Sequence, residues 1–477
     1  MRDRILFYLN GRRVEVAGDD VFLTLSDFLR KRRGLTGTKV VCAEGDCGSC
    51  TVLVGRPEAG KLNYLPVTSC IQILFQLDAA HVVTVEGLRD GNALNPIQQA
   101  MVSCQGSQCG FCTPGFVVSL QGLMSDGMPV DTEKVRRGLT GNLCRCTGYD
   151  SIIRSAMSAD RSKLMPVGSL YSSSEMLAVL ESASQEPVRI ETTDRRFYKP
   201  TTINDAAQYR LDNPDCTIIA GGTDLGVVYN KRIRQITNAM SLAGVTSLRQ
   251  VRVEPTAINI GAGCLLTTLL TLSQKYLPEL GRFMEWFGSP LIRNAGTVGG
   301  NLVTGSPIGD TIPAMIVLGA EIEIAGVAGS RTVPIGNFYT GYRQTVLAPG
   351  ELVMTVRIPL LGECRLLKLY KISRRKDLDI SSFGAAIWIQ QSNGVIDDIR
   401  LAFGGVGPMV MRLPETEAML RGKSPTLDNF QQAGEVARQE VKPISDVRGS
   451  ADYRKTLAAN ILIRFWHEVI NENNILV

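Results

Sequence analysis

Histidine and long apolar runs are what this chain of 477 residues has least of. Only two histidines occur, His81 and His467, which argues against a histidine-rich zinc or copper site and against a histidine-dependent catalytic triad. No apolar stretch reaches the ~18–20 residues that cross a bilayer. The start, Met1-Arg2-Asp3-Arg4, runs directly into a strand-like segment without a small-residue cleavage site. We therefore expect no membrane span and no secretory signal.

Strong charge is missing too. The formal net charge is only +5, which argues against a dedicated nucleic-acid surface, and the basic run Arg30-Lys31-Arg32-Arg33 is typical of a solvated helix end. A hydrophobic content of 44% with 20% charged residues describes a soluble globular protein. The length predicts two to four domains, and we expect a cytoplasmic location.

Cysteine, in contrast, is abundant and unevenly placed. There are 12 cysteines, and nine of them fall between Cys42 and Cys146. Because cytosolic chains do not keep structural disulfides, such a dense group indicates metal or redox chemistry. The remaining three, Cys216, Cys264 and Cys364, are isolated and are predicted to pack in the core.

The first group has the spacing Cys42-x4-Cys47-x2-Cys50, and Cys70 follows after nineteen intervening residues. This is the spacing by which plant-type ferredoxins hold a 2Fe–2S cluster: three thiolates come from one tight loop and the fourth closes the site. Glycines in the loop let backbone N–H groups approach the sulfur atoms. The alternative is a zinc knot with four thiolates, although zinc sites usually pair CxxC with a second CxxC or a CxxH.

The second group of four is Cys109, Cys112, Cys144 and Cys146, in a stretch that is predicted to be helical. Pro114 suits the first turn of a helix, which places Cys109 and Cys112 in a loop at a helix N-terminus. Cys144 and Cys146 precede a second helix start. Cys104 lies five positions before Cys109 and imitates the first group's spacing, so the residues alone leave its role open.

Glycine-rich segments follow in the second half of the chain. No G-x-G-x-x-G fingerprint follows a strand, which disfavours a Rossmann site. The segment Thr217-Ile-Ile-Ala-Gly-Gly-Thr-Asp-Leu225 is an apolar strand that leads into a Gly-Gly turn, where backbone N–H groups can cradle a pyrophosphate. A purely structural turn would have the same pattern. A second segment, Ile292-Arg-Asn-Ala-Gly-Thr-Val-Gly-Gly-Asn301 with Ser306-Pro-Ile-Gly-Asp310, combines glycines, hydroxyls and an acid.

Two motifs make the chain resemble the molybdenum hydroxylases, the xanthine dehydrogenase family. They are Gly106-Ser-Gln-Cys-Gly-Phe-Cys-Thr-Pro-Gly115 and Gly141-Asn-Leu-Cys-Arg-Cys-Thr-Gly-Tyr149. The resemblance implies that Cys109, Cys112, Cys144 and Cys146 bind a second 2Fe–2S cluster, with Cys104 outside the ligand set, and that Gln108 touches the pterin of a molybdenum cofactor on another subunit. It also implies the FAD contacts Ala220, Gly221, Gly222, Thr223, Asp224, Leu225, Phe287, Thr297, Gly300, Asn301, Asp310 and Lys371.

The resemblance implies an α+β multidomain fold. It predicts a β-grasp, plant-type ferredoxin domain over 1–90, an all-helical 2Fe–2S domain over 91–160 and a serine-rich linker with one short helix over 161–195. A non-Rossmann, PCMH-type FAD-binding domain over 196–365 and an α+β flavoprotein C-terminal domain over 366–477 follow. This order resembles the small subunit of two-chain bacterial members of the family. No residues remain for a molybdopterin domain.

The implied function is electron transfer. In such an enzyme, electrons pass from the molybdopterin centre of a large subunit through two 2Fe–2S clusters to FAD and then to NAD+. The substrate would be hypoxanthine or xanthine; the alternative is an N-heterocycle or an aldehyde. No side chain of this chain is expected to act as a general base, which agrees with the shortage of histidine. The family also implies a dimer of heterodimers, and a zinc-stapled scaffold without a redox role stays as the non-enzymatic alternative.

Overall fold

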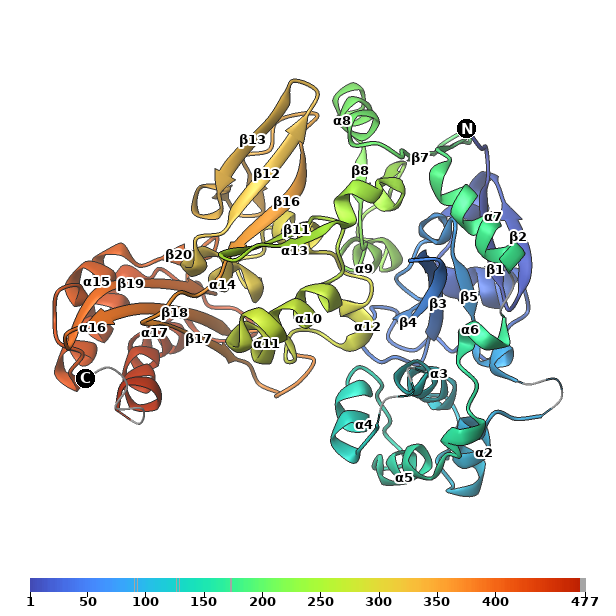
Figure 1. Cartoon of the computed structure of the whole chain (residues 1–477), viewed down its shortest axis with the longest axis horizontal. Helices are drawn as coiled ribbons and strands as arrows, with labels where there is room; N and C mark the ends of the chain where they lie inside the picture. The colour runs from blue at the N-terminus through green and yellow to red at the C-terminus, as the bar shows by residue number, and fades with distance from the viewer. Residues whose placement is uncertain (90, 92, 126, 128, 172–173, 472–477) are drawn as a thin grey trace. The chain divides into compact units, whose positions relative to one another are not determined.

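The structure is a computed structural model that describes residues 1–477 except 90, 92, 126, 128, 172–173 and 472–477 (Figure 1). The chain divides into two compact units. Unit 1 contains Met1–Thr246 and Gly288–Gly296, and unit 2 contains Ser247–Phe287 and Thr297–Val477. The range predicted for the FAD-binding domain therefore contributes residues to both units.

Unit 1 begins with a five-stranded mixed sheet of order β2-β1-β5-β3-β4. β1 pairs with β5 in parallel, and the other neighbours are antiparallel, as expected for the β-grasp fold. Alternate residues of β1, namely Ile5, Phe7 and Leu9, are buried, which is the period of two of a strand with one face on a core. The strands are β1 (Ile5–Leu9), β2 (Arg12–Val16), β3 (Thr51–Glu58), β4 (Lys61–Thr68) and β5 (His81–Val83), and the short helix α1 (Leu25–Asp27) continues as a π-helix over Phe28–Arg32.

The next stretch is helical, as predicted. The side chain of Asn95 accepts a hydrogen bond from the backbone N–H of Gln98, and the side-chain oxygen of Gln98 accepts one from the backbone N–H of Asn95, which forms a capping box. Pro114 lies in the first turn of the following helix. The helices are α2 (Pro96–Ser103), α3 (Thr113–Met124), α4 (Thr132–Gly138) and α5 (Asp150–Ser158).

The segment predicted as a linker with one short helix is more structured than expected. It contains a 3-10 turn over Arg161–Lys163, α6 (Val167–Leu170), α7 (Ser174–Gln185) and the whole strand β6 (Val188–Glu191); residues 172–173 lie outside the described residues. Met176, Leu180 and Ala183 recur at helical spacing and pack on Leu6 and Ala79 of the first sheet. The serine content concealed this apolar stripe.

A second sheet of unit 1 has the order β6-β7-β9-β8. β7 and β8 both run parallel to β9, so that β8 ends beside its neighbour and leads into a turn and a helix. One hydrophobic core serves both sheets, since Phe75 stacks on Phe197 with ring centroids 4.5 Å apart. The elements are β6 (Val188–Glu191), β7 (Arg196–Lys199), α8 (Ile203–Asp212), β8 (Thr217–Ile219), α9 (Leu225–Asn230), β9 (Asn238–Ser241) and α12 (Pro290–Arg293).

Unit 2 starts with a five-stranded antiparallel sheet of order β10-β11-β16-β12-β13. α14 (Thr311–Leu318) is apolar and buried along its whole length, so it is an internal helix of this unit. The remaining elements are β10 (Val251–Val253), β11 (Ala257–Gly261), α10 (Leu266–Tyr276), α11 (Pro278–Met284), α13 (Val298–Val303), β12 (Glu321–Gly326), β13 (Gly329–Pro334), β14 (Tyr339–Gly341), β15 (Gln344–Thr345) and β16 (Leu352–Pro359).

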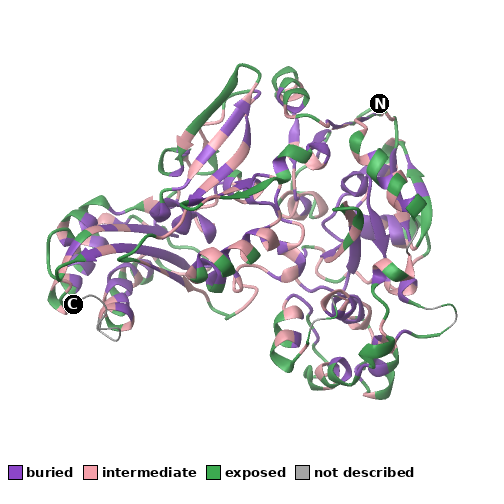
Figure 2. Cartoon of the chain, in the orientation of Figure 1, coloured by how far each residue is buried: buried purple, intermediate pink, exposed green. Residues whose placement is uncertain are grey.

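From residue 365 the chain forms an antiparallel sheet of order β17-β18-β19-β20. Figure 2 shows buried residues along its central strands. Among the described residues, no helix is both long and apolar enough to span a membrane. The elements are β17 (Arg365–Ile372), β18 (Phe383–Ser392), β19 (Val395–Gly404), β20 (Met411–Arg412), α15 (Pro414–Leu420), α16 (Leu427–Glu440) and α17 (Ala451–Phe465), which continues as a π-helix to Asn471.

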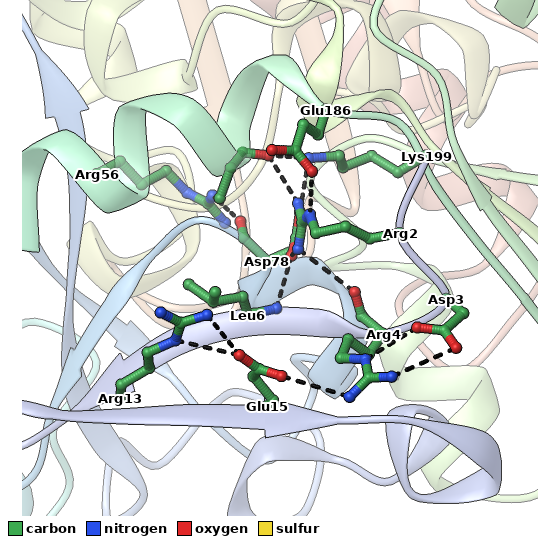
Figure 3. Close-up of polar contacts among 11 residues, drawn as sticks. Arg2, Asp3, Arg4, Leu6, Arg13, Glu15, Arg56, Asp78, Glu186 and Lys199 are labelled. Carbon is green, nitrogen blue, oxygen red and sulfur yellow. Dashed lines mark hydrogen bonds and ion pairs between the residues drawn. The ribbon is translucent and has the colours of Figure 1, made fainter.

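A buried carboxylate ties the parts of unit 1 together (Figure 3). Asp78 accepts hydrogen bonds from the backbone N–H of Leu6 at 2.8 Å, from Arg2 at 2.8 Å and from Lys199 at 2.6 Å. The side chains of Asp78 and Lys199 are 1% and 3% exposed. Burial removes water from the ammonium and lowers the pKa of Lys199, an effect that the charge of Asp78 opposes. The pair therefore joins the first sheet to β7.

We expect Asp78→Ala to destabilise the protein by about 3–5 kcal/mol, because it leaves a buried ammonium without its partner. The exposed pair of Asp20 with Arg32 offers a matched control, and Asp20→Ala should cost less than about 1 kcal/mol. Urea unfolding of both variants measures the difference. Equal losses of stability in the two variants would contradict the conclusion that the buried Asp78 carboxylate joins the parts of unit 1.

His81 is fully buried and neutral in this fold. Its Nε2 accepts a hydrogen bond from the backbone N–H of Gly11 at 3.0 Å, and its Nδ1 lies 2.6 Å from the hydroxyl of Tyr64. Burial lowers the pKa of His81 to about 4, because the charged form loses its hydration. A proton on Nε2 would face the N–H of Gly11. The histidine therefore supports the fold only while it is neutral.

Folding stability should consequently fall as the pH drops from about 6.5, the pKa of an unfolded histidine, towards 4. In that window the unfolded chain binds the proton and the folded chain does not, so the loss approaches about 1.4 kcal/mol for each pH unit. Urea midpoints measured across this range should decline less steeply for His81→Gln than for the unaltered protein. The same slope in both proteins would show that His81 does not titrate with unfolding.

Candidate functional site

The first group of cysteines comes together around the loop that precedes β3. Cys47, Cys50 and Cys70 are buried, and Cys42 is partly exposed. The backbone N–H groups of Glu44 and Cys47 donate to the sulfur of Cys42 at 3.5 and 3.4 Å. Cys70 follows β4 and forms hydrogen bonds with both Cys42 and Cys50. The loop and the strand end thus form one thiol cage, as the spacing predicted.

The four thiols of this cage differ in the direction in which their pKa values are shifted. The hydrogen bond from Cys47 lowers the pKa of Cys42 far below its ordinary value, and the bond from Cys70 lowers that of Cys50. The partners Cys47 and Cys70 have raised pKa values, chiefly through their bonds to Cys42. The shifts follow from the hydrogen bonds between these sulfur atoms, so the four side chains of the cage lie close together.

The second group comes together from the two predicted loops. Cys112 is the N-cap of α3, and Cys144 lies in the loop before α5. The sulfur of Cys146 lies 3.6 Å from that of Cys109, and Cys112 forms a hydrogen bond with Cys144. Burial raises the pKa of Cys112 to about 12. Cys109 and Cys146 are exposed, whereas Cys144 is buried.

The thiol pairs fit a two-iron cluster. Two thiolates on one tetrahedral metal, at bonds of ~2.3 Å, lie roughly 3.7 Å apart, close to the separation of 3.6 Å between Cys109 and Cys146. Among the residues that the structure describes, no group of three or more His, Cys, Asp or Glu side chains is arranged to hold a single metal ion. In the second group the pairs Cys109–Cys146 and Cys112–Cys144 are compatible with an iron pair, in which each iron takes two protein sulfurs.

The other cysteines differ from these two groups. Cys104 is the C-cap of α2, and its sulfur lies 3.1 Å from the hydroxyl of Ser158. Cys216 and Cys264 are buried, as predicted. The prediction that Cys364 packs in the core is wrong: it is exposed, in a turn between β16 and β17 where its φ is +58°. Cys364 is exposed because it lies in a turn that connects two strands, and such connections usually run over the protein surface.

Three side chains that the sequence reasoning passed over shape the second group. The hydroxyl of Tyr149 accepts the backbone N–H of Cys144 at 3.0 Å, and the hydroxyl of Thr147 donates to the sulfur of Cys144 at 3.1 Å. Tyr149 has a φ of +71°, an uncommon backbone state for tyrosine. Asn142 is buried. All three belong to the second motif, which was the available signal.

The two cysteine loops are in direct backbone contact. The N–H of Leu143 donates to the carbonyl of Cys47 at 2.9 Å, and the amide of Asn142 donates to the carbonyl of Gly48 at 3.2 Å. Asn142 in turn accepts the hydroxyl of Ser119 from α3 at 2.8 Å. A Cβ on Gly115 would lie 2.1 Å from the carbonyl oxygen of Gly48. Close approach of the loops therefore requires glycine at this point.

The predicted pyrophosphate turn, Ala220–Leu225, connects β8 to α9 in unit 1. Gly222 has a φ of +74°, and the N–H of Gly226 donates to its carbonyl at 2.7 Å to begin the helix. A Cβ on Gly221 would lie 2.2 Å from the carbonyl oxygen of Ala295. Both glycines are thus required by the backbone, and a strand–turn–helix at the carboxyl end of a parallel strand suits a phosphate group.

The other predicted FAD contacts belong to unit 2, where the structure pairs several with one another. Thr297 caps α13 by accepting the N–H of Gly300 at 3.1 Å, and Asn301 accepts the hydroxyl of Thr311. Lys371 and Asp310 form an ion pair at 2.5 Å between side chains that are 8% and 7% exposed. Ser381, which the sequence reasoning missed, also donates to Asp310.

The remaining predicted contacts, Phe287, Gln108 and Asp224, differ in how far their side chains are exposed. Phe287 is partly buried at the end of its segment of unit 2. Gln108 is exposed in the loop ahead of α3, beside Cys109. Asp224 is exposed in the pyrophosphate turn. These positions leave Gln108 and Asp224 accessible to a group outside the chain.

Four family models match successive parts of the chain. A 2Fe–2S iron–sulfur cluster binding domain matches residues 7–71, and a second 2Fe–2S binding domain matches 84–157. The FAD binding domain in molybdopterin dehydrogenase matches 190–361, and the CO dehydrogenase flavoprotein C-terminal domain matches 368–469. The first two ranges contain the two cysteine groups, and the third contains the pyrophosphate turn.

Known proteins resemble the whole chain or its flavin part. The xanthine dehydrogenase of Emericella nidulans is 30% identical over 98% of this chain and 39% of its own length, and the xanthine dehydrogenase/oxidase of Gallus gallus is 26% identical over 98% and 40%. The chain thus spans about two fifths of the length of these curated relatives. Among solved structures, carbon monoxide dehydrogenase from Hydrogenophaga pseudoflava has a TM-score of 0.54 at 28% identity, covering 56% of this chain and 94% of its own. Quinoline 2-oxidoreductase from Pseudomonas putida 86 has 0.53 at 27%, covering 57% and 96%.

Fold, thiol cages and matching domains define an iron–sulfur flavoprotein with two 2Fe–2S domains and an FAD-binding domain. The chain belongs to the molybdenum hydroxylase family, of which it contains the iron–sulfur and FAD part. The resemblance that the motifs indicated is therefore confirmed.

Gly115→Ala should disturb both cysteine loops, because its methyl group would collide with the backbone of Gly48. We expect a loss of about 1–3 kcal/mol of stability and reduced iron content, measured by unfolding and by iron and sulfide analysis. Gly168→Ala is the control: its Cβ would meet only a ring carbon of Tyr64 at 4.0 Å. If Gly115→Ala retained full iron, the close contact would not matter for cluster binding.

Proposed function

We propose that this chain passes electrons from a molybdopterin centre on a partner to NAD+. The ligands of the first 2Fe–2S cluster are Cys42, Cys47, Cys50 and Cys70, and those of the second are Cys109, Cys112, Cys144 and Cys146. The clusters supply one-electron steps when bound, and FAD joins these to the two-electron chemistry of a nicotinamide. The chain's own residues hold these groups and control their access to water.

The observation that supports this order of groups is a gradient of burial in unit 1. Cys109 and Cys146 of the second set are exposed, whereas Cys47, Cys50 and Cys70 of the first set are buried. The first loop touches the second through Asn142 and Leu143, and on its other side it touches α9. The exposed sulfurs of Cys109 and Cys146 are more accessible to an outside donor than any cysteine of the first set, of which Cys42 alone is partly exposed. Electrons would therefore enter at the second set and continue inward to the flavin.

The surface around the second set supports a protein partner. Several apolar side chains there are exposed, although such residues usually avoid water: Val102 at 65%, Phe111 at 49%, Met157 at 46% and Tyr149 at 37%. Gln108 is exposed in the same loop as Cys109 and Phe111, and we propose that it contacts the pterin of the partner's cofactor. We infer a molybdopterin-binding large subunit as the partner, in a dimer of heterodimers. All 12 cysteines are free thiols, which fits a reducing cytoplasm.

The substrate follows from the partner. Relatives named xanthine dehydrogenase support xanthine as the substrate. Hypoxanthine as a further substrate and NAD+ as the acceptor are part of the same proposal through the resemblance of the two cysteine motifs. The resemblance to quinoline 2-oxidoreductase favours a second candidate, an N-heterocycle other than a purine. The complex with its large subunit should be tested with both substrate classes, and NADH should be measured. If quinoline gave NADH while hypoxanthine and xanthine gave none, the N-heterocycle would replace the purine as the proposed substrate. If the substrate reduced the complex but no NADH formed, NAD+ would be excluded as the acceptor.

In the reduced protein, low-temperature EPR should show two different 2Fe–2S signals. We expect Cys109→Ser to remove or alter the signal of the second cluster and to leave the first, since Cys109 is exposed and lies outside the first cage. Cys216→Ser, at a buried cysteine outside both cages, is the control and should keep both signals. One signal in the unaltered protein, or zinc without iron, would overturn the proposal.

A further inference from the structure

Gln76 links the segment that follows the first cysteine group to the pyrophosphate turn. It lies in the 3-10 helix Leu74–Leu77 and is 5% exposed. Its Oε1 accepts the backbone N–H of Ile73 at 2.9 Å, and its Nε2 donates to the carbonyl of Gly221 at 3.2 Å. One end of the amide therefore holds its own segment and the other end holds the turn.

The turn lies directly on this segment. A Cβ on Gly222 would be 2.7 Å from Nε2 of Gln76, and a Cβ on Gly226 would be 2.0 Å from the carbonyl oxygen of Ile71. Ile71 follows Cys70 and packs with Cys50, Cys70, Val227 and Ile292. The segment of seven residues, 70–76, thus begins with the proposed cluster ligand Cys70 and ends with Gln76, which donates a hydrogen bond to the flavin turn.

The segment is itself fixed. Arg56 donates to the carbonyl of Gln76 at 2.5 Å, and Asp78 is held by Arg2 and Lys199 (Figure 3). Lys199 ends β7, which pairs with β9, and β9 pairs with β8, the strand that enters the turn. The turn is therefore supported both through its own sheet and through Gln76.

We propose that Gln76, whose amide joins the Ile73 N–H to the Gly221 carbonyl, is a positioning residue for FAD binding supplied by the iron–sulfur part of the chain. The inference rests on the proposed function, since it takes Ala220–Leu225 as the pyrophosphate site. By holding the Gly221 carbonyl, Gln76 turns that acceptor away from an anionic ligand and fixes the N–H groups that face it. The flavin site thus needs the neighbouring domain for its shape.

The test is Gln76→Met in the full chain with both clusters loaded. FAD binding to the deflavinated protein is followed by flavin fluorescence, and cluster signals are followed by EPR. We expect the dissociation constant for FAD to rise about fivefold to tenfold, the change that one neutral hydrogen bond produces, with both EPR signals kept. Gln121→Met is the matched control: Gln121 is also fully buried and donates to the carbonyl of Met165 at 3.0 Å, away from the turn.

The outcomes separate the inference from the proposed function. Unchanged FAD affinity in Gln76→Met, or an equal loss in Gln121→Met, would overturn the role of Gln76. Failure of the unaltered protein to bind FAD would instead overturn the proposed function. If Gln76→Met does not fold, Arg56→Met removes the hydrogen bond to the Gln76 carbonyl and should weaken FAD binding about twofold; no change there would equally overturn the inference.

Discussion

The backbone contact of the first cysteine loop with its neighbours is the constraint on which the rest of unit 1 depends. On one side the carbonyls of Cys47 and Gly48 accept hydrogen bonds from Leu143 and Asn142. On the other, Asn230 at the end of α9 donates to the carbonyl of Ala43 at 2.8 Å. Redox groups must be held close to exchange electrons, and contact between main chains gives the shortest separation that a folded protein allows.

Burial then decides how this arrangement can be used. The second cysteine group has two exposed sulfurs, whereas three cysteines of the first group are buried and Cys42 is partly exposed beside α9. An enclosed set of thiolates is protected from water and from oxidants that attack accessible sulfur. The exposed set, surrounded by apolar side chains, suits a surface that another protein covers. The same fold thus gives the two cysteine groups different access to solvent.

Local patterns in the sequence were reliable where short-range chemistry decides the structure. Pro114 indicated a helix start, and the cysteine spacing indicated two groups of thiols that come together in the structure. The linker prediction was incomplete because serines concealed the stripe of Met176, Leu180 and Ala183. The burial of Cys364 was predicted wrongly because an isolated cysteine gives no sign of the turn it occupies.

The sequence by itself determined which residues are candidate ligands, because ligand identity depends on thiolates a few positions apart in one loop. Only the tertiary structure decided what surrounds them. The pairing of Asp310 with Lys371, and the contact of Gln76 with Gly221 across 145 positions, join segments far apart in the chain. Such contacts arise when whole sheets and helices pack on a common core. They cannot be derived from the spacing of residues along the chain.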